Sequence, residues 1–121
     1  MKRHRDGEAW ENAARGYLSS FGLDILKQRY RCRLGELDLV CREASMLVIV
    51  EVRSRKRGAQ VSAVDSIDRH KQRKIILATR HLLMSHPAWD AYTLRFDVLT
   101  IDDSDTPAPR VRWWRDAFRA D

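Results

Sequence analysis

The chain has 121 residues, the size of one domain, and its 23 Lys and Arg against 17 Asp and Glu give a net charge of +6. No stretch reaches the ~18 consecutive apolar residues of a membrane-spanning helix, and the charged amino terminus has no apolar export signal, which argues against membrane-spanning and exported proteins. The two cysteines form no disulfide framework, so we expect a soluble cytoplasmic protein whose basic character fits a polyanionic partner or simply a solvated surface.

The first predicted element is an amphipathic helix over residues 9–21. Asp6 is its expected N-cap, and Gly22 offers a left-handed stop. The apolar residues that recur at intervals of three and four are Ala9, Trp10, Ala13, Ala14, Tyr17, Leu18 and Phe21.

Three strands are predicted next. Residues 23–33 mix apolar and basic side chains, as an exposed edge strand does, and Gly35 offers a turn into an antiparallel strand over residues 36–41. Cys32 and Cys41 flank this turn and are placed to face each other across the hairpin. Residues 46–50 are continuously apolar and rich in β-branched side chains, which predicts a central strand covered on both faces.

The second half predicts one helix and two strands. After a charged loop at residues 56–60, a helix is expected to begin near Asp65 or Ser66, to bury Ile75, Ala78 and Leu82, and to close at residues 85–87. A strand over residues 94–101, a polar turn and a short strand over residues 111–114 complete a single α/β domain, residues 1–121, in the order αβββαββ.

Acidic residues interrupt two otherwise apolar strands, and they carry the chemistry. Residues two apart on a strand share a face, so Glu36 and Asp38 lie together on one strand, while Glu51, Arg53 and Arg55 lie together on the next. A buried carboxylate costs several kcal/mol without a partner. Asp38 and Glu51 suit Mg²⁺ or Mn²⁺, which takes hard oxygen ligands, water and substrate phosphate. The alternative is a structural ion pair with Arg53, Arg33 or Arg55, and the residues by themselves do not decide between the two.

Several motifs in register resemble the YraN-like family of predicted endonucleases, within the PD-(D/E)XK nuclease superfamily. The resemblance covers almost the whole chain, from the first helix, which ends in Tyr17-Leu18, to the closing strand. It implies that a short Asp-Ala-Phe turn follows this strand. Its motifs are Gly35-Glu36-Leu37-Asp38-Leu39-Val40, Val50-Glu51-Val52-Arg53-Ser54-Arg55, Lys71-Gln72-Arg73-Lys74-Ile75, Arg95-Phe96-Asp97-Val98 and Trp113-Trp114-Arg115-Asp116-Ala117-Phe118.

The resemblance implies a restriction-endonuclease-like fold, with a mixed central sheet flanked by helices. It also implies that Asp38 and Glu51 bind the metal and that Glu11, rather than Glu8, completes the site from the first helix. The superfamily's catalytic lysine corresponds to position 53, which is Arg here. Because Arg stays protonated, Arg53 can stabilise negative charge but cannot act as a base. A role for Lys71 near a phosphate or an acid is also implied.

The first functional hypothesis is therefore a metal-dependent endonuclease acting on nucleic acid, with DNA favoured and branched or damaged DNA as a candidate substrate. Glu11 or Glu36 would orient water and Arg53 would stabilise the phosphate. The residues expected to bind the nucleic acid are Arg33, Arg55, Lys56 and Lys71.

Two alternatives come from other classes of protein. One is a catalytically inactive nucleic-acid-binding module of the same fold, whose affinity would fall steeply with salt. The other is a protein-interaction domain that forms a homodimer through an exposed edge strand. Three tryptophans, Trp89, Trp113 and Trp114, are candidates for base stacking, since the last two lie among Arg110, Arg112 and Arg115, although packing within the fold explains all three better.

Overall fold

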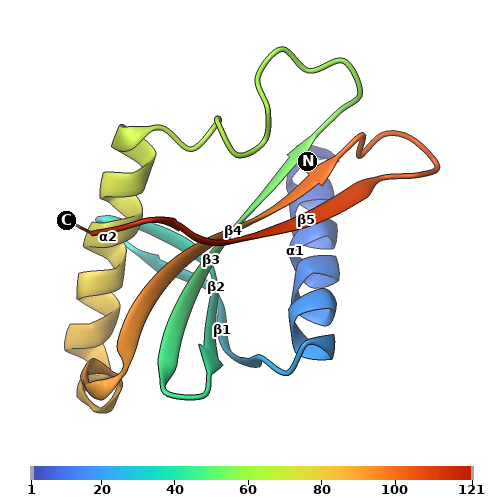
Figure 1. Cartoon of the computed structure of the whole chain (residues 1–121). Helices are drawn as coiled ribbons and strands as arrows, with labels where there is room; N and C mark the ends of the chain where they lie inside the picture. Colours follow the sequence, from blue (N-terminus) through green and yellow to red (C-terminus); the bar gives the residue numbers. More distant parts are fainter. Residues whose placement is uncertain (1, 121) are drawn as a thin grey trace.

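A five-stranded mixed sheet lies between two helices in the computed structural model, which describes residues 2–120 and the side chains from Gly7 onward (Figure 1). The order αβββαββ is confirmed, with one short 3-10 helix added. The elements are α1 (Lys2–Ser20), β1 (Asp24–Cys32), β2 (Gly35–Glu43), β3 (Met46–Arg55), α2 (Arg69–Ser85), η1 (Pro87–Ala91), β4 (Thr93–Asp102) and β5 (Arg110–Phe118). None of the described helices is long and apolar enough to cross a membrane.

The strands lie in the order β1-β2-β3-β4-β5, so β1 is an edge strand and β3 is central, as predicted. Neighbouring strands are antiparallel except β3 and β4, which are parallel and are connected by the crossover through α2. This topology brings the β1–β2 turn, the carboxyl ends of β3 and β4 and the start of β5 to the same end of the sheet. The restriction-endonuclease-like mixed sheet with flanking helices is compatible with this arrangement.

Each face of the sheet carries its own hydrophobic layer. On one face Ala14 and Leu18 of α1 pack on Val48 and Val50, and on the other face residues of α2 pack on Leu47 and Ile49. Because β3 supplies side chains to both layers, it has to be apolar at successive positions. Ile75, Ala78 and Leu82 are the buried stripe of α2, as predicted.

The structure corrects both predicted helix starts. α1 begins at Lys2, so Asp6 lies within the helix and is not its N-cap. α2 begins at Arg69, because Asp68 caps it by accepting a hydrogen bond from the Lys71 N–H at 2.8 Å. Asp65 belongs to a preceding turn, in which its N–H donates to the Ser62 hydroxyl. The stop of α1 at Gly22 is confirmed, with φ of +90°.

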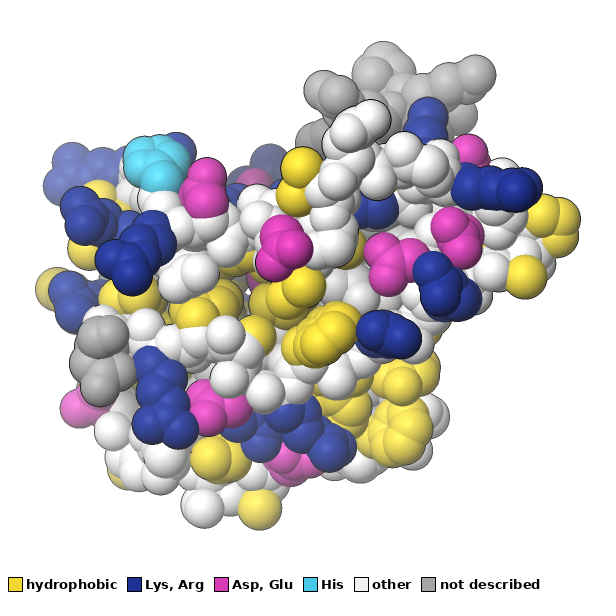
Figure 2. Space-filling model, turned by 45° about the horizontal axis from the view of Figure 1, so that its top comes forward, with side chains coloured by type: hydrophobic (Ala, Val, Ile, Leu, Met, Phe, Trp, Pro, Cys, Tyr) yellow, Lys and Arg dark blue, Asp and Glu magenta, His cyan; other side chains and the backbone are white. Residues whose placement is uncertain are grey.

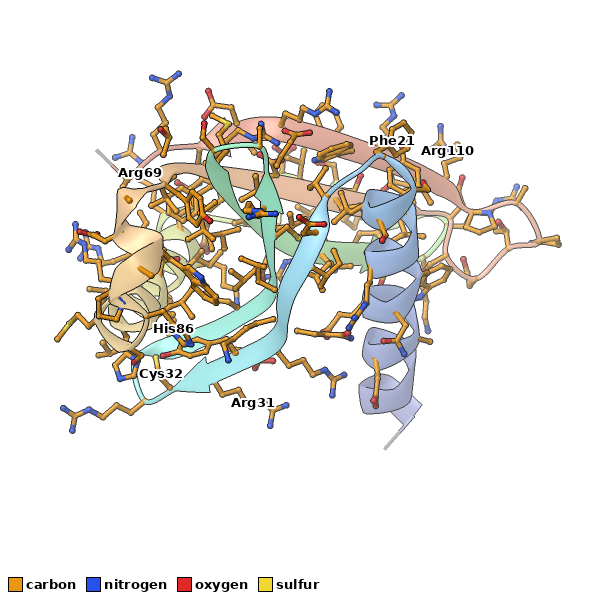
Figure 3. The ribbon with its side chains drawn as sticks, turned by 90° about the horizontal axis from the view of Figure 1, so that it is seen from below. Phe21, Arg31, Cys32, Arg69, His86 and Arg110 are labelled. Carbon is orange, nitrogen blue, oxygen red and sulfur yellow. The ribbon has the colours of Figure 1, made fainter. Side chains whose placement is uncertain are left out.

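Two further expectations were wrong. β5 continues to Phe118, and Asp116, with φ of +52°, forms an irregularity in its pairing with β4 in place of a terminal turn. Cys32 and Cys41 do not face each other, because Cys32 is paired with Gly35 and Cys41 with Ile25. Cys41 is buried against α1, whereas Cys32 packs on the α2 side, where β1 ends (Figure 3).

Gly35 brings β2 into close contact with α2. A Cβ atom at this position would lie 3.0 Å from the Lys74 carbonyl oxygen and 3.6 Å from the Ala78 Cβ. A backbone carbonyl inside a helix cannot move aside as the tip of a long side chain can. The glycine is therefore required by the spacing between strand and helix.

We predict that Gly35→Ala lowers the free energy of unfolding by about 1–3 kcal/mol, the usual cost of overpacking. Gly16→Ala is the matched control, because Gly16 lies on the exposed side of α1 and a Cβ atom added there would meet nothing within 4 Å. Alanine should there stabilise the protein by about 0.8–1 kcal/mol, since it favours helix. Urea denaturation of both variants measures the difference, and equal effects would contradict this account of Gly35.

Candidate metal centre

A cavity of about 200 Å³ lies at the end of the sheet where β2 begins and β3 ends. It is lined by α1, β2, β3 and the first turn of α2, so residues far apart in sequence meet there. Its charged lining consists of Glu11, Glu36, Asp38, Glu51, Arg53 and Lys71. Asp38, Glu51, Arg53, Glu11 and Glu36, the five residues expected to carry the chemistry, are thus brought together.

The strand pairing brings Asp38 beside Arg29 at the end of the β2–β3 ladder. The β1–β2 register sets Arg29 opposite Asp38, and the β2–β3 pairing ends at Leu39↔Val50, the pair that adjoins Asp38 and Glu51. The strands separate beyond this pair, and the Asp38 Oδ2 atom accepts a hydrogen bond from the Val52 N–H at 2.8 Å. The Asp38 carboxylate therefore occupies the place of a backbone acceptor between the strands.

The regular alternation of side chains fails at Asp38. Leu37 packs on the α2 side of the sheet and Leu39 on the α1 side, although residues two apart on an ideal strand share a face. Arg29, opposite, has φ of +57°, which is uncommon outside glycine. The expected reason for the convergence of Glu36 with Asp38 was therefore incomplete, because a local distortion positions Asp38.

Glu51 is the most buried acid of the cavity, with 3% of its surface exposed. Its Oε1 atom lies 3.4 Å from Arg53 Nη2 and 3.6 Å from Lys71 Nζ. Its Oε2 atom and Arg53 Nε are buried without a hydrogen-bond partner among the described residues. The structural ion pair weighed as an alternative is thus present at one carboxylate oxygen, while the other oxygen is unsatisfied.

Both carboxyl groups hold protons more tightly than usual. Burial raises the pKa of Asp38 to about 6, which the Val52 N–H opposes and the charge of Glu11 reinforces. Burial and the charge of Asp38 raise the pKa of Glu51 well above its usual value, against the opposing charges of Lys71 and Arg53. Two neighbouring carboxylates with little access to water are typical of a site that binds a cation or shares a proton.

Glu11, the acid from α1, is bound by Arg29, whose role was not predicted from the sequence. Arg29 Nε lies 2.8 Å from the Glu11 Oε1 atom, and Arg29 Nη1 lies 3.8 Å from Glu8. Glu11 is the more buried acid and lines the cavity, as the family resemblance implied. Its carboxylate is engaged by Arg29, whose position in a basic strand gave no sign of this role.

The remaining predicted residues surround the cavity without all lining it. Glu36 lies on its rim, half-exposed, 3.6 Å from Arg31. Arg33 is exposed in the β1–β2 turn, Arg55 ends β3 with its Nη1 donating to the Ser54 carbonyl, and Lys56 follows in the exposed loop. Antiparallel pairing of β2 with β3 sets all three at the same end of the sheet as the cavity.

The donor set fits Mg²⁺ or Mn²⁺ and does not fit a closed structural metal site. No group of three or more His, Cys, Asp or Glu within the described part of the chain is arranged around one point. Mg²⁺ does not need such a group, because it keeps several waters and uses one or two carboxylates together with substrate phosphates. Asp38 and the unsatisfied oxygen of Glu51 are the two carboxylates that this requires.

Comparison with known proteins gives a consistent result along the whole chain. A family model described as "Uncharacterised protein family UPF0102" matches residues 10–101. A UPF0102 protein of Legionella pneumophila is 41% identical over 114 residues, which are 94% of each chain. One from Ectopseudomonas mendocina is 40% identical over 121 residues, covering 99% of this chain and 100% of the relative, and one from Nitrosococcus oceani is 41% identical over 119 residues, covering 98% and 95%.

We predict that Asp38→Asn raises the free energy of unfolding of the metal-free protein by on the order of 1–3 kcal/mol near pH 8. Asparagine keeps an acceptor for the Val52 N–H and removes a charge that burial disfavours. Because the folded-state pKa is raised to about 6, the cost of Asp38 is absent below its unfolded pKa of about 4 and grows as the pH rises through 6.

Denaturation with urea in the presence of a chelator, repeated from about pH 8 to about pH 4, measures this effect. The advantage of the variant should shrink as the pH falls. Asp90→Asn, which neutralises an exposed acid in η1, should change the free energy of unfolding little at any pH. A loss of stability in Asp38→Asn near pH 8 would instead show that Asp38 acts as a structural ion-pair partner.

Proposed function

We propose that this chain, which belongs to the uncharacterised protein family UPF0102, the YraN-like group, is a metal-dependent endonuclease that hydrolyses phosphodiester bonds in nucleic acid. The observation that carries the proposal is the meeting of Asp38 and Glu51 in one cavity, with a buried Glu51 oxygen that has no partner within the described residues. Retaining such a pair costs stability, and a divalent cation held by both carboxylates would remove that cost. DNA is the favoured substrate, and its branched or damaged forms are the first to be tested.

In this proposal Asp38 and Glu51 would hold the cation. Mg²⁺ or Mn²⁺ would supply Lewis-acid chemistry, by favouring the ionisation of water and by neutralising charge on the phosphate. The Val52 N–H fixes the Asp38 carboxylate, so the site is organised before the cation arrives. Glu36, half-exposed on the rim, would accept a hydrogen bond from the attacking water. Glu11 is tied to Arg29 and serves to position Arg29 and the α1 side of the cavity.

In this proposal, Arg53 and Lys71 together take the role of the single catalytic lysine of the superfamily. Arg53 stays protonated and stabilises negative charge on the phosphate. Lys71, from α2, reaches the same Glu51 oxygen at 3.6 Å, with 34% of its side chain exposed. Because an ammonium group can release a proton, Lys71 is the residue of the pair that is able to act as an acid or a base. Arg33, Arg55 and Lys56 are proposed to bind the substrate backbone at this end of the sheet.

One observation favours the second candidate, a nucleic-acid-binding module without catalysis. Arg53 and Lys71 both neutralise Glu51, as they would in a site that has exchanged its metal for ion pairs. Such a module would bind nucleic acid with strong salt dependence and would bind no divalent cation at Asp38. Metal binding therefore separates the two candidates.

Isothermal titration with Mn²⁺ is expected to show one site that is weakened at least about tenfold, about 1.4 kcal/mol, by Asp38→Asn or Glu51→Gln. The loss follows because each substitution removes one of the two anionic ligands. Asp90→Asn is the control for removing an acid elsewhere on the surface, and it should bind Mn²⁺ like the unmodified chain. Equal Mn²⁺ binding by all four proteins would reject the metal centre.

Cleavage of plasmid DNA and of a four-way junction in Mn²⁺ tests the division of labour. We expect Lys71→Arg to slow cleavage by on the order of 10²–10⁴-fold, because the charge remains but proton transfer is lost. Arg53→Lys should retain activity to within about tenfold, since it keeps the positive charge beside the phosphate. If Lys71→Arg cleaves as fast as the unmodified chain, Lys71 contributes charge alone.

A further inference from the structure

The sheet face that carries Glu51 and Arg53 continues to the outer strand. The parallel pairing of β3 with β4 aligns Glu51 with Val98 and Arg53 with Thr100, and the β4–β5 pairing aligns these with Trp114 and Arg112. Paired residues of neighbouring strands project on the same face of a sheet. Trp114 and Arg112 therefore lie on the same face as the candidate metal centre, two strands away, which is roughly 10 Å.

α2 does not cover this part of the face. Arg69, where α2 begins, lies well apart from Arg110, where β5 begins (Figure 3). On the side seen when the top of the molecule is brought forward, hydrophobic side chains lie next to Lys and Arg (Figure 2). Trp114 remains 37% exposed, although its indole N–H is already satisfied.

Trp114 is a fixed and accessible ring. Its Nε1 atom donates to the Thr100 hydroxyl at 3.0 Å, and the Arg112 guanidinium lies 5.6 Å from its ring centroid. Arg112 is exposed and contacts the Trp114 ring, and no ion pair within residues 7–120 neutralises its charge. Thr100 itself is buried, which anchors the ring to the centre of the sheet.

The neighbouring tryptophan has a different environment. Trp113 faces the α1 side, contacts Phe21, and donates its Nε1–H to Asp97 at 2.9 Å. Packing within the fold, the explanation favoured for both tryptophans from the sequence, therefore holds for Trp113. It leaves the exposed ring of Trp114 unexplained.

We propose that Trp114 and Arg112 bind an unpaired nucleotide within about three nucleotides of the phosphate that is cut. An exposed aromatic ring beside an available arginine matches the base-stacking surfaces of single-strand-binding proteins, in which arginine holds the backbone. The inference rests on the proposed nuclease function, because Glu51 and Arg53 define where the phosphate lies. It adds a substrate class: nucleic acid with a single-stranded segment beside the cleavage point, such as a flap, a branch or an open end.

The distance between the candidate metal centre and Trp114 supports a substrate with a single-stranded segment. A separation of roughly 10 Å across two strand spacings corresponds to about three nucleotides, at about 3.4 Å per nucleotide in a stacked strand. A base that stacks on Trp114 must be outside a duplex, because in a duplex both of its faces are covered by neighbouring bases. The basic side chains at this end of the sheet, Arg33, Arg55 and Lys56, would then follow the continuing backbone.

Binding is measured by fluorescence anisotropy with labelled oligothymidine and with a blunt duplex of equal length, in a chelator so that no cleavage occurs. We expect the oligothymidine to bind more tightly, and Trp114→Ala to weaken its binding by about 5- to 100-fold. Trp114→Phe should bind within a few-fold, because it keeps a ring for stacking. Arg112→Ala should weaken binding and lower its salt dependence, whereas Arg80→Ala, the loss of an equally exposed arginine on α2, should do neither.

Intrinsic fluorescence provides the second readout. Oligothymidine should quench the tryptophan emission of the unmodified chain, and Trp114→Phe should abolish most of this quenching while retaining binding. Equal binding of oligothymidine by Trp114→Ala, or quenching that survives in Trp114→Phe, would overturn the inference. Because these assays contain no metal, a chain that binds as expected but fails to cleave would reject the proposed nuclease and leave this surface standing.

Discussion

The candidate site depends on two buried carboxyl groups at the open end of a sheet, where burial disfavours the charge of both. Asp38 and Glu51 come from neighbouring strands, and burial raises the pKa of both. Arg53 and Lys71 compensate one oxygen of Glu51, and no described residue offers a hydrogen bond to the other. A protein under selection for stability alone would replace one acid of such a pair, so their coexistence is the main reason to assign the cavity a chemical role.

Much of the fold follows from patterns that are visible in the sequence. The apolar run in β3 identified the centre of the sheet, and the three- and four-residue spacing of Ala14 and Leu18 identified the buried side of α1. Helix starts were less predictable, because Asp65, Ser66 and Asp68 all have side chains that cap helices, and only Asp68 lies where the chain turns into α2. Such a choice is made by tertiary packing and not by local preference.

The geometry of the candidate site could also be predicted only in part from the sequence. The pairing of Asp38 with Glu51 could be anticipated from strand alternation and from family resemblance, yet the alternation fails at Asp38 itself. The left-handed conformation of Arg29 and its contact with Glu11 had no sequence signal, since a basic residue in an edge strand looks like any other. The contrast between Trp113 and Trp114 likewise required the sheet register, because adjacent residues of a strand face opposite sides.

The contact at Gly35 has a consequence for the site beyond its effect on packing. Its neighbour across the interface is the carbonyl of Lys74, one helical turn from Lys71. The closeness of strand and helix at that point therefore determines how far the Lys71 ammonium extends toward Glu51. A position without a side chain thus influences the distance between Lys71 and Glu51, so variation at residue 35 would alter the charged cluster without changing any of its members.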